Sequence, residues 1–140
     1  MFKKTVTYTD YNGVERTEDF YFNLTKAELL EMELGTDGGF SSKLERILNS
    51  KDVKEIIGVY KELLEKSYGV KSADGSRFVK SDELVRDFVA SPAYSDLFML
   101  FATDEDAAAE FIKEVVPSDM KQEVSKIQLL ESQKAAEKKA

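Results

Sequence analysis

The chain has 140 residues and a formal net charge of −7, and it contains neither cysteine nor histidine. The absence of cysteine excludes disulfides and thiolate zinc sites, and the absence of histidine excludes imidazole metal ligands and histidine-based catalytic triads. The acidic balance also disfavours binding to nucleic acid, which depends on basic side chains that neutralise phosphates. We therefore expect a non-catalytic protein that uses no cofactor and binds no nucleic acid.

The hydrophobic content of 42% is sufficient for a core, and the charged content of 34% suits a helical, water-exposed surface. A chain of this length is expected to form a single domain. The N-terminus carries no apolar run of the signal-peptide kind, and no stretch approaches the roughly 18 apolar residues of a membrane span. We therefore expect a cytoplasmic protein that makes no contact with a membrane.

Residues 2–22 are expected to form a β-hairpin around the turn Asp10-Tyr-Asn-Gly13. A two-residue loop would divide the apolar side chains of the two strands between opposite faces. A three-residue loop, with Gly13 in the left-handed region as a bulge, gathers them on one face, so we favour this register. The side chains on that face are Phe2, Val6, Tyr8, Phe20 and Phe22. Because an isolated hairpin is marginal in water, this face must rest on helices or on another copy of the protein.

A helix is expected to follow the hairpin directly, over residues 26–34. Thr25 and Glu28 have the spacing of a capping box, in which each side chain accepts a hydrogen bond from the other residue's backbone N–H. The glycine-rich segment 35–39 ends this helix. It does not match a phosphate-binding loop, because no Gly-Lys-Ser/Thr motif follows and no buried strand precedes it.

Two more helices are predicted over residues 40–48 and 52–68 from apolar side chains that recur at helical spacing. The inward residues expected in the first are Leu44, Ile47 and Leu48, and those expected in the second are Val53, Ile56, Ile57, Tyr60, Leu63, Leu64 and Ser67. Ser50 is the expected cap of the second, and Gly69 is expected to end it in the left-handed conformation. Residues 70–80 are predicted as a loop or as a small hairpin with Val70 opposite Phe78 or Val79. A calcium loop in this region does not fit, because its acidic residues lack the required spacing.

Three helical segments are predicted between residues 81 and 116, each starting from a polar cap. Ser81 caps the first, Ser91 followed by Pro92 starts the second, and Thr103 is the expected cap of the third. The second is apolar nearly all round, which predicts a place in the core. Residues 104–106 are acidic, which suits the N-terminus of a helix. The alternative is that these carboxylates form a metal site or the active site of a carboxylate-based enzyme.

The expected fold class is mainly α with an N-terminal β-hairpin (α+β), with a compact body of five to six helices. One globular domain is expected over residues 1–117, with the hairpin at 2–22 and the helical body at 25–116. Residues 118–140 are expected to form a C-terminal helix or a flexible tail. The candidate interaction surface joins the hairpin face to a thin apolar stripe of that tail. Its residues are Phe2, Val6, Tyr8, Phe20, Phe22, Met120, Val124 and Ile127.

The N-terminal sequence resembles a known family of phage proteins. Residues 4–13, KTVTYTDYNG, and residues 17–29, TEDFYFNLTKAEL, are similar to the start of tail assembly chaperones of long-tailed, siphovirus-type phages of Gram-positive bacteria. The resemblance is strong over residues 1–34 and looser over the helical remainder. The family has no catalytic residues, so none is transferred to this chain.

The resemblance implies that the protein binds the tape measure protein, a long helical protein, and keeps it soluble while tail-tube subunits polymerise around it. It also implies a homo-oligomer that acts with a frameshifted longer form of itself. We expect the protein to be located in the host cytoplasm during infection and to be absent from the mature virion. The alternative function is a structural tail or connector component of the virion. Whether the hairpin or the tail stripe would bind the tape measure protein stays open.

Overall fold

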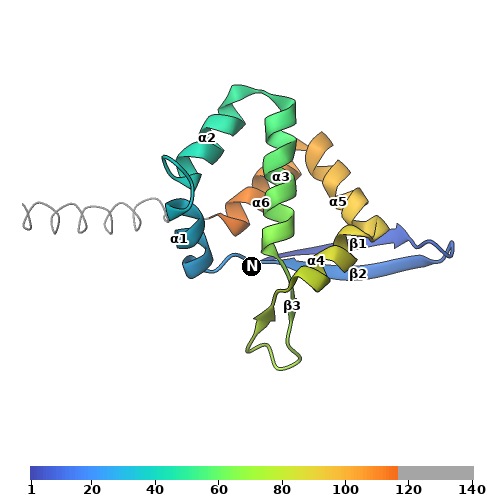
Figure 1. Ribbon diagram of the computed structural model, residues 1–140. Helices are drawn as coiled ribbons and strands as arrows, with labels where there is room; N and C mark the ends of the chain where they lie inside the picture. The colour runs from blue at the N-terminus through green and yellow to red at the C-terminus, as the bar shows by residue number, and fades with distance from the viewer. Residues whose placement is uncertain (117–140) are drawn as a thin grey trace, which may run out of the picture.

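The computed structural model describes residues 1–116, which form a four-stranded sheet and six helices. The strands are β1 (Phe2–Thr9), β2 (Glu15–Phe22), β3 (Tyr68–Lys71) and β4 (Phe78–Val79). The helices are α1 (Lys26–Leu34), α2 (Phe40–Ser50), α3 (Val53–Ser67), α4 (Asp82–Val89), α5 (Pro92–Thr103) and α6 (Glu105–Val115). Figure 1 shows α2, α3, α5 and α6 on one side of the long β1–β2 hairpin. This confirms the expected fold class, while the predicted tail over 118–140 lies outside the described residues.

The hairpin has the three-residue loop and the register that the sequence favoured. Gly13 has a φ of 79°, and its N–H donates to the Asp10 carbonyl at 3.0 Å. The Asp10 N–H donates to the Val14 carbonyl at 2.8 Å, which closes the bulge. The resulting register places Phe2 opposite Phe22. All five apolar hairpin residues therefore share one face, as expected.

A second, short hairpin extends the sheet, in the order β1-β2-β3-β4. Val70 pairs with Val79, as the hairpin alternative predicted, and Gly69 pairs with Tyr21 of β2. The prediction that Gly69 ends α3 in the left-handed conformation is wrong, because the chain passes from α3 straight into β3. A Cβ atom on Gly69 would lie 2.6 Å from the Phe78 ring and 2.9 Å from the Val79 carbonyl oxygen. This position requires glycine because of close approach between strands.

The junction between hairpin and helices is held by the predicted capping box. The Glu28 N–H donates to the Thr25 hydroxyl oxygen at 3.1 Å, and the Thr25 N–H donates to the Glu28 carboxylate at 3.0 Å. The same carboxylate accepts a hydrogen bond from the Lys80 ammonium at 2.7 Å, and Lys80 also donates to the Asn23 carbonyl at 2.6 Å. The start of α1 is thereby tied to the residue that follows β4, 52 positions later in the chain.

Two helices begin at a different residue from the one predicted. Asp52 caps α3 in place of Ser50, and Asp104 caps α6 in place of Thr103. Each aspartate accepts hydrogen bonds from two backbone N–H groups of the first turn. The hydroxyls of Ser50 and Thr103 instead donate to carbonyls of the preceding helix. The carboxylate is the better cap, because it carries charge toward the positive end of the helix dipole.

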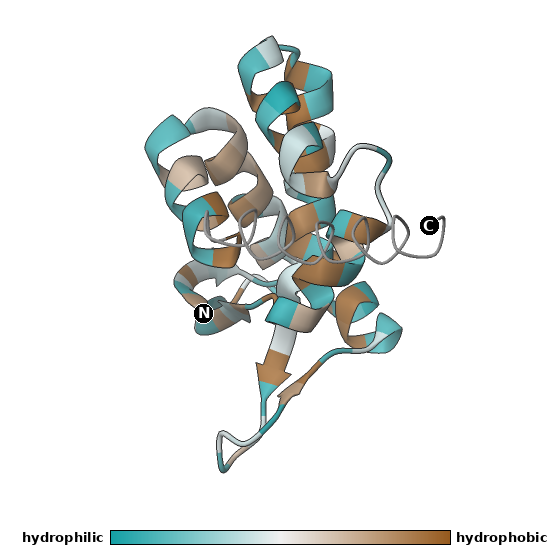
Figure 2. Ribbon diagram, turned by 90° about the vertical axis from the view of Figure 1, so that its left-hand side faces the viewer, coloured by the Kyte–Doolittle hydropathy of each residue, from teal (hydrophilic) through white to brown (hydrophobic). Residues whose placement is uncertain are grey.

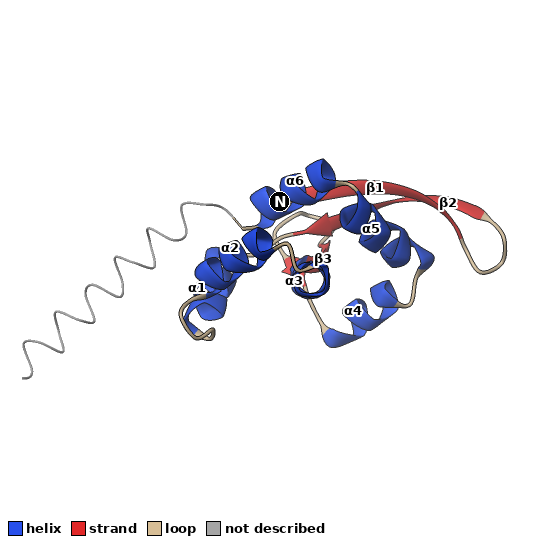
Figure 3. Cartoon of the chain, turned by 90° about the horizontal axis from the view of Figure 1, so that it is seen from above, coloured by secondary structure: helices blue, strands red, loops and turns tan. Residues whose placement is uncertain are grey.

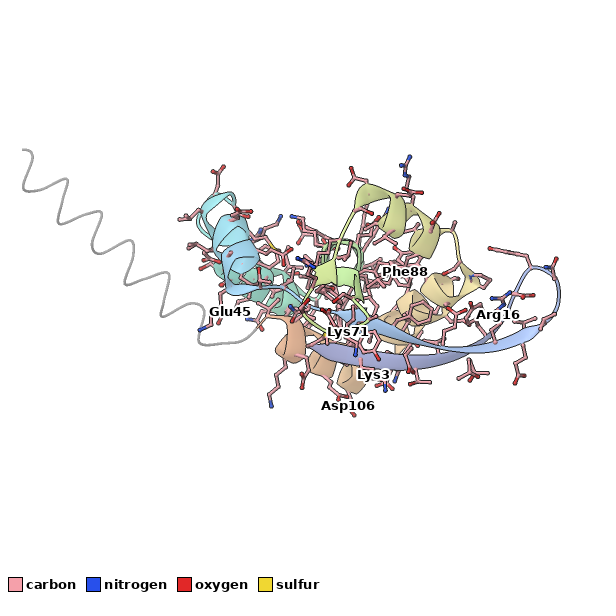
Figure 4. The ribbon with its side chains drawn as sticks, turned by 90° about the horizontal axis from the view of Figure 1, so that it is seen from below. Lys3, Arg16, Glu45, Lys71, Phe88 and Asp106 are labelled. Atoms are coloured by element: carbon pink, nitrogen blue, oxygen red, sulfur yellow. The ribbon has the colours of Figure 1, made fainter. Side chains whose placement is uncertain are left out.

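The core is an aromatic cluster between the hairpin and the last three helices. Phe22 and Phe111 are fully buried, and their ring centroids lie 5.7 Å apart in an edge-to-face arrangement. Phe101 stacks on Phe111 at 4.8 Å. Figure 2 shows hydrophobic residues concentrated on the helix faces that meet one another, and Figure 4 shows Phe88 of α4 in the crowded interior. The sheet and helices therefore share one hydrophobic core.

The helical stripes differ from the prediction at three residues. Leu97 and Phe101 of α5 are buried, which confirms the expected core position of this helix, but Met99 is exposed. On α3, Val59 is buried although the sequence pattern did not assign it inward, and Val53 is 67% exposed although the pattern did. Contacts of α3 with both α2 and α5 explain why Val59 is buried. The exposure of Val53 leaves an apolar side chain at the protein surface.

Candidate functional site

The hairpin part of the candidate interaction surface lies inside the protein. Its residues Phe2, Val6, Tyr8, Phe20 and Phe22 are each at most 8% exposed. The Phe20 ring packs against Phe88 of α4, and the Phe2 ring packs against Phe111 of α6, both with centroids 5.4 Å apart. The sequence left open whether this face packs on the protein's own helices or on another copy of the protein. In the structure it packs on the protein's own helices. These side chains are therefore not presented on the surface of the described protomer.

The tail part of the candidate surface, Met120, Val124 and Ile127, lies outside the described residues. Within residues 1–116, large apolar side chains reach the surface at several separate places. Two of them, Leu48 and Val53, border an apolar groove between helices. This groove is the candidate functional site.

The groove has a volume of about 580 Å³ and lies where the ends of four helices meet. Its walls come from the C-terminal end of α2, the N-terminal half of α3, the C-terminal end of α5 and the start of α6. Its larger apolar lining residues are Leu48, Val53, Ile56, Ile57, Tyr60 and Phe101. Figure 1 shows the N-terminal end of α3 beside α2 and near the upper end of α5, where these walls converge.

The helical period explains how the groove is lined. Val53, Ile56, Ile57 and Tyr60 follow the spacing of one helix face, so they project from α3 toward the same side. At the deeper end of this stripe, the Tyr60 ring stacks on Phe101 with centroids 6.4 Å apart. At the outer end, Val53 stands in the first turn of α3 and is largely exposed. The stripe therefore runs from the core to the surface without being covered along its whole length.

Two charged residues line the groove beside these apolar side chains, Lys51 and Glu105. Lys51 has a φ of 59° and is the only non-glycine residue within 1–116 with a positive φ. This left-handed conformation costs about 1 kcal/mol for a residue with a Cβ atom, and it ends α2 so that α3 can begin two residues later. One cation and one anion at an apolar groove suit the mixed surface of an amphipathic helix.

Tyr60 is the most buried of the polar residues that line the groove. Burial, and to a smaller extent the negative charge of Glu105, raises the pKa of Tyr60. The hydroxyl therefore stays protonated at neutral pH and acts as a hydrogen-bond donor. Glu105 is the one carboxylate among the residues that line the groove.

The acidic positions considered for a metal have structural roles in the described residues. Asp104 caps α6 by accepting two N–H groups, and Asp74 accepts hydrogen bonds from Ser72 and Ser76 in the β3–β4 turn. No group of three or more acidic residues with the geometry of a metal site occurs within residues 1–116. None of the helices described there has the length and apolar character needed to cross a bilayer.

Sequence reasoning assigned Leu48, Ile56 and Ile57 to helix faces that point inward but did not identify the groove. The signal was present in Val53, which extends the apolar stripe of α3 one turn beyond the residues that the core can cover. It could not be interpreted without knowing where α2 and α6 end. The groove depends on the arrangement of four helices, and that arrangement is not encoded in the period of any one of them.

Comparison with known proteins gives a match at the level of the family. Searches of curated proteins and of solved structures found no match. The family model described as "Phage tail assembly chaperone" matches residues 1–140, which is the whole chain. This agrees with the resemblance carried by residues 1–34. The chain belongs to the phage tail assembly chaperone family.

Proposed function

We propose that the protein binds the tape measure protein of its phage and keeps it soluble during tail assembly, without catalysing a reaction. Membership of the tail assembly chaperone family supports a partner among the tail proteins. The resemblance of residues 4–29 to chaperones from siphovirus-type phages of Gram-positive bacteria supports the tape measure protein as that partner. A long helical protein that has not yet been enclosed by the tail tube exposes apolar helix faces, which need cover to prevent aggregation.

The observation that carries the proposal is the open apolar groove between α2, α3, α5 and α6. Its occupant in this proposal is an amphipathic helix of the tape measure protein. Helix-in-groove binding places apolar side chains spaced by three or four residues into an apolar channel, and the groove offers such a channel with Leu48 and Val53 at its margin. Lys51 and Glu105 then contact charged residues beside the apolar face of the bound helix.

The remaining features follow from the same proposal. Residues 1–117 act as one globular domain that carries the groove, and residues 118–140 contribute a second apolar contact through Met120, Val124 and Ile127. The protein acts as a homo-oligomer together with a frameshifted longer form of itself. It works in the host cytoplasm during infection and is left out of the mature virion.

Co-expression tests both the function and the groove. The tape measure protein is expressed alone, with the wild-type chain, with Leu48→Asp/Val53→Asp, or with the control Val14→Asp/Val79→Asp. The control changes two valines that are also exposed but lie on the hairpins, away from the groove. Leaving a buried polar group unpaired costs about 1–3 kcal/mol and a carboxylate costs more, so the groove variant should bind about tenfold or more weakly. Wild type and control should raise the soluble fraction of the tape measure protein and co-purify with it.

The outcomes separate two claims. If the wild-type chain neither solubilises the tape measure protein nor co-purifies with it, the proposed function is wrong. If wild type and groove variant act equally well, the function stands and the groove is not the binding site. A mass-spectrometric inventory of purified virions tests the alternative, because a structural tail or connector component would be present in stoichiometric amounts and an assembly chaperone would be absent.

A further inference from the structure

The two edges of the sheet differ in a way that identifies a second interaction surface. The β4 edge is only two residues long, whereas β1 at the other edge spans eight residues. Short edge strands are one of the ways in which proteins avoid pairing with other chains. Figure 3 shows β1 as the outer strand of the long hairpin, with β2 between it and β3. The long edge lacks the protection that the short edge has.

The hairpin loop fixes which backbone groups face this edge. Asp10 and Val14 are a hydrogen-bonded pair, and in an antiparallel ladder such pairs alternate with pairs that are not hydrogen-bonded. The even-numbered residues of β1 therefore bond to β2, and the odd-numbered residues direct their N–H and C=O groups to the open edge. The residues with outward groups are Lys3, Thr5, Thr7 and Thr9. None of these outward groups has a hydrogen-bond partner within residues 1–116.

The side chains on β1 do little to prevent pairing. Charged residues, prolines and bulges commonly protect an exposed edge. In β1, charge is confined to Lys3 and Lys4 at one end, the ladder contains no proline, and its pairing with β2 is continuous from Phe2 to Thr9. On the solvent face of the sheet, Thr5 and Thr7 have only uncharged hydroxyls, which bond across to β2. The central part of the edge is therefore continuous and uncharged.

We infer that β1 pairs antiparallel with β1 of a second copy of this chain, which joins two sheets across a two-fold axis. A register centred on Val6 places Thr5 opposite Thr7 of the second copy, and Lys3 opposite Thr9 of the second copy. Both members of each pair have outward backbone groups, so each pair exchanges two hydrogen bonds. No lysine lies opposite a lysine. Val6 lies beside Val6 of the second copy on the buried face, so the apolar layer continues across the joint.

Self-complementarity is the reason to assign the edge to a second copy. An isologous interface requires each residue to meet its symmetry-related counterpart without conflict. Here the charged end of each β1 meets the uncharged end of the other, and threonines meet threonines at the centre. The inference rests on the homo-oligomer of the proposed function and specifies how two copies would meet. The interface uses the outer edge of β1 and shares no residue with the groove.

Charge substitutions at the centre of β1 test the register directly, with the full chain and sedimentation equilibrium as the measurement. Thr5→Lys/Thr7→Lys places lysines opposite one another twice, which should weaken the dimer about fivefold or more. Thr5→Lys/Thr7→Glu places opposite charges in the same positions and should restore dimerisation to about the wild-type level or better. Val79→Lys, at an exposed position of β4 on the opposite edge of the sheet, is the control that should change nothing.

A proline substitution tests the backbone contribution. Thr7→Pro removes an N–H that points outward and takes part in no hydrogen bond of the hairpin, a position where edge strands accept proline. It should abolish dimerisation and leave far-ultraviolet circular dichroism unchanged. The inference is overturned if the wild-type chain is monomeric at all concentrations, if the double lysine variant associates as tightly as wild type, or if the Lys/Glu variant is as weak as the double lysine variant.

Discussion

Replacing Phe22 by alanine is the most direct test of the hairpin as part of the protein's own core. Phe22 is 0% exposed, and its ring lies 5.7 to 6.2 Å from four others. Those rings belong to Phe2, Tyr68, Phe88 and Phe111, so the substitution opens a cavity where β1, β3, α4 and α6 meet. Truncating a buried phenylalanine to alanine costs about 3–5 kcal/mol. A typical domain has about 5–15 kcal/mol of stability, so this loss removes a large fraction of it.

Urea unfolding followed by circular dichroism at 222 nm is a suitable assay, because the chain has no tryptophan to report on its core. Phe22→Ala should lower the free energy of unfolding by about 3–5 kcal/mol with an unchanged slope. Tyr11→Ala, at a hairpin position that is 85% exposed, should change it by less than about 0.5 kcal/mol. A loss of less than about 1 kcal/mol for Phe22→Ala would mean that the hairpin does not close the core.

Three further predictions concern local contacts. Thr25→Ala removes the hydroxyl that accepts a hydrogen bond from the Glu28 N–H, and it should lower the free energy of unfolding by about 1 kcal/mol. Thr25→Ser keeps a hydroxyl at this position and should keep the stability. Equal urea midpoints for the two variants would contradict this. Gly69→Ala forces a Cβ atom against the Phe78 ring and should abolish hydrogen-exchange protection in β3 and β4; retained protection would contradict the close approach. Hydrogen bonds from the Ser76 N–H, the Ser72 hydroxyl and the Ser76 hydroxyl lower the pKa of Asp74 to about 2. The contribution of Asp74 to turn stability is therefore present above the unfolded pKa and lost as pH falls toward about 2. A nuclear magnetic resonance titration that places this pKa at the ordinary value of 3.8 would contradict this.

Local sequence rules predicted the features that depend on a few neighbouring residues. The capping box at Thr25 and Glu28, the hairpin register set by Gly13, and the bounds of α1 all follow from short-range geometry, and the structure confirms them. Burial of the hairpin face also follows from its pattern, because five apolar side chains on one face must pack against other apolar residues. The pattern left open whether those residues belong to the same chain or to another copy.

Features that depend on contacts between distant segments were not predictable in the same way. The pairing of β3 with β2 places Gly69 opposite Tyr21. The sequence around either residue contains no signal that identifies the other as its partner. The sequence accordingly offered a C-terminal helix stop as the role of Gly69, which is the commoner use of glycine in that position. The groove was missed for a related reason, since Val53 fits an inward stripe until the ends of α2 and α6 are known.

The measurement closest to the central claim is site-specific photo-crosslinking in cells that also express the tape measure protein. A photoreactive amino acid at position 53, on the margin of the groove, should form a covalent adduct with the tape measure protein on irradiation. The same amino acid at position 11, on the exposed hairpin loop, should form little or none. An adduct from position 11 alone, or none from position 53, would contradict the account of how this chaperone holds its client.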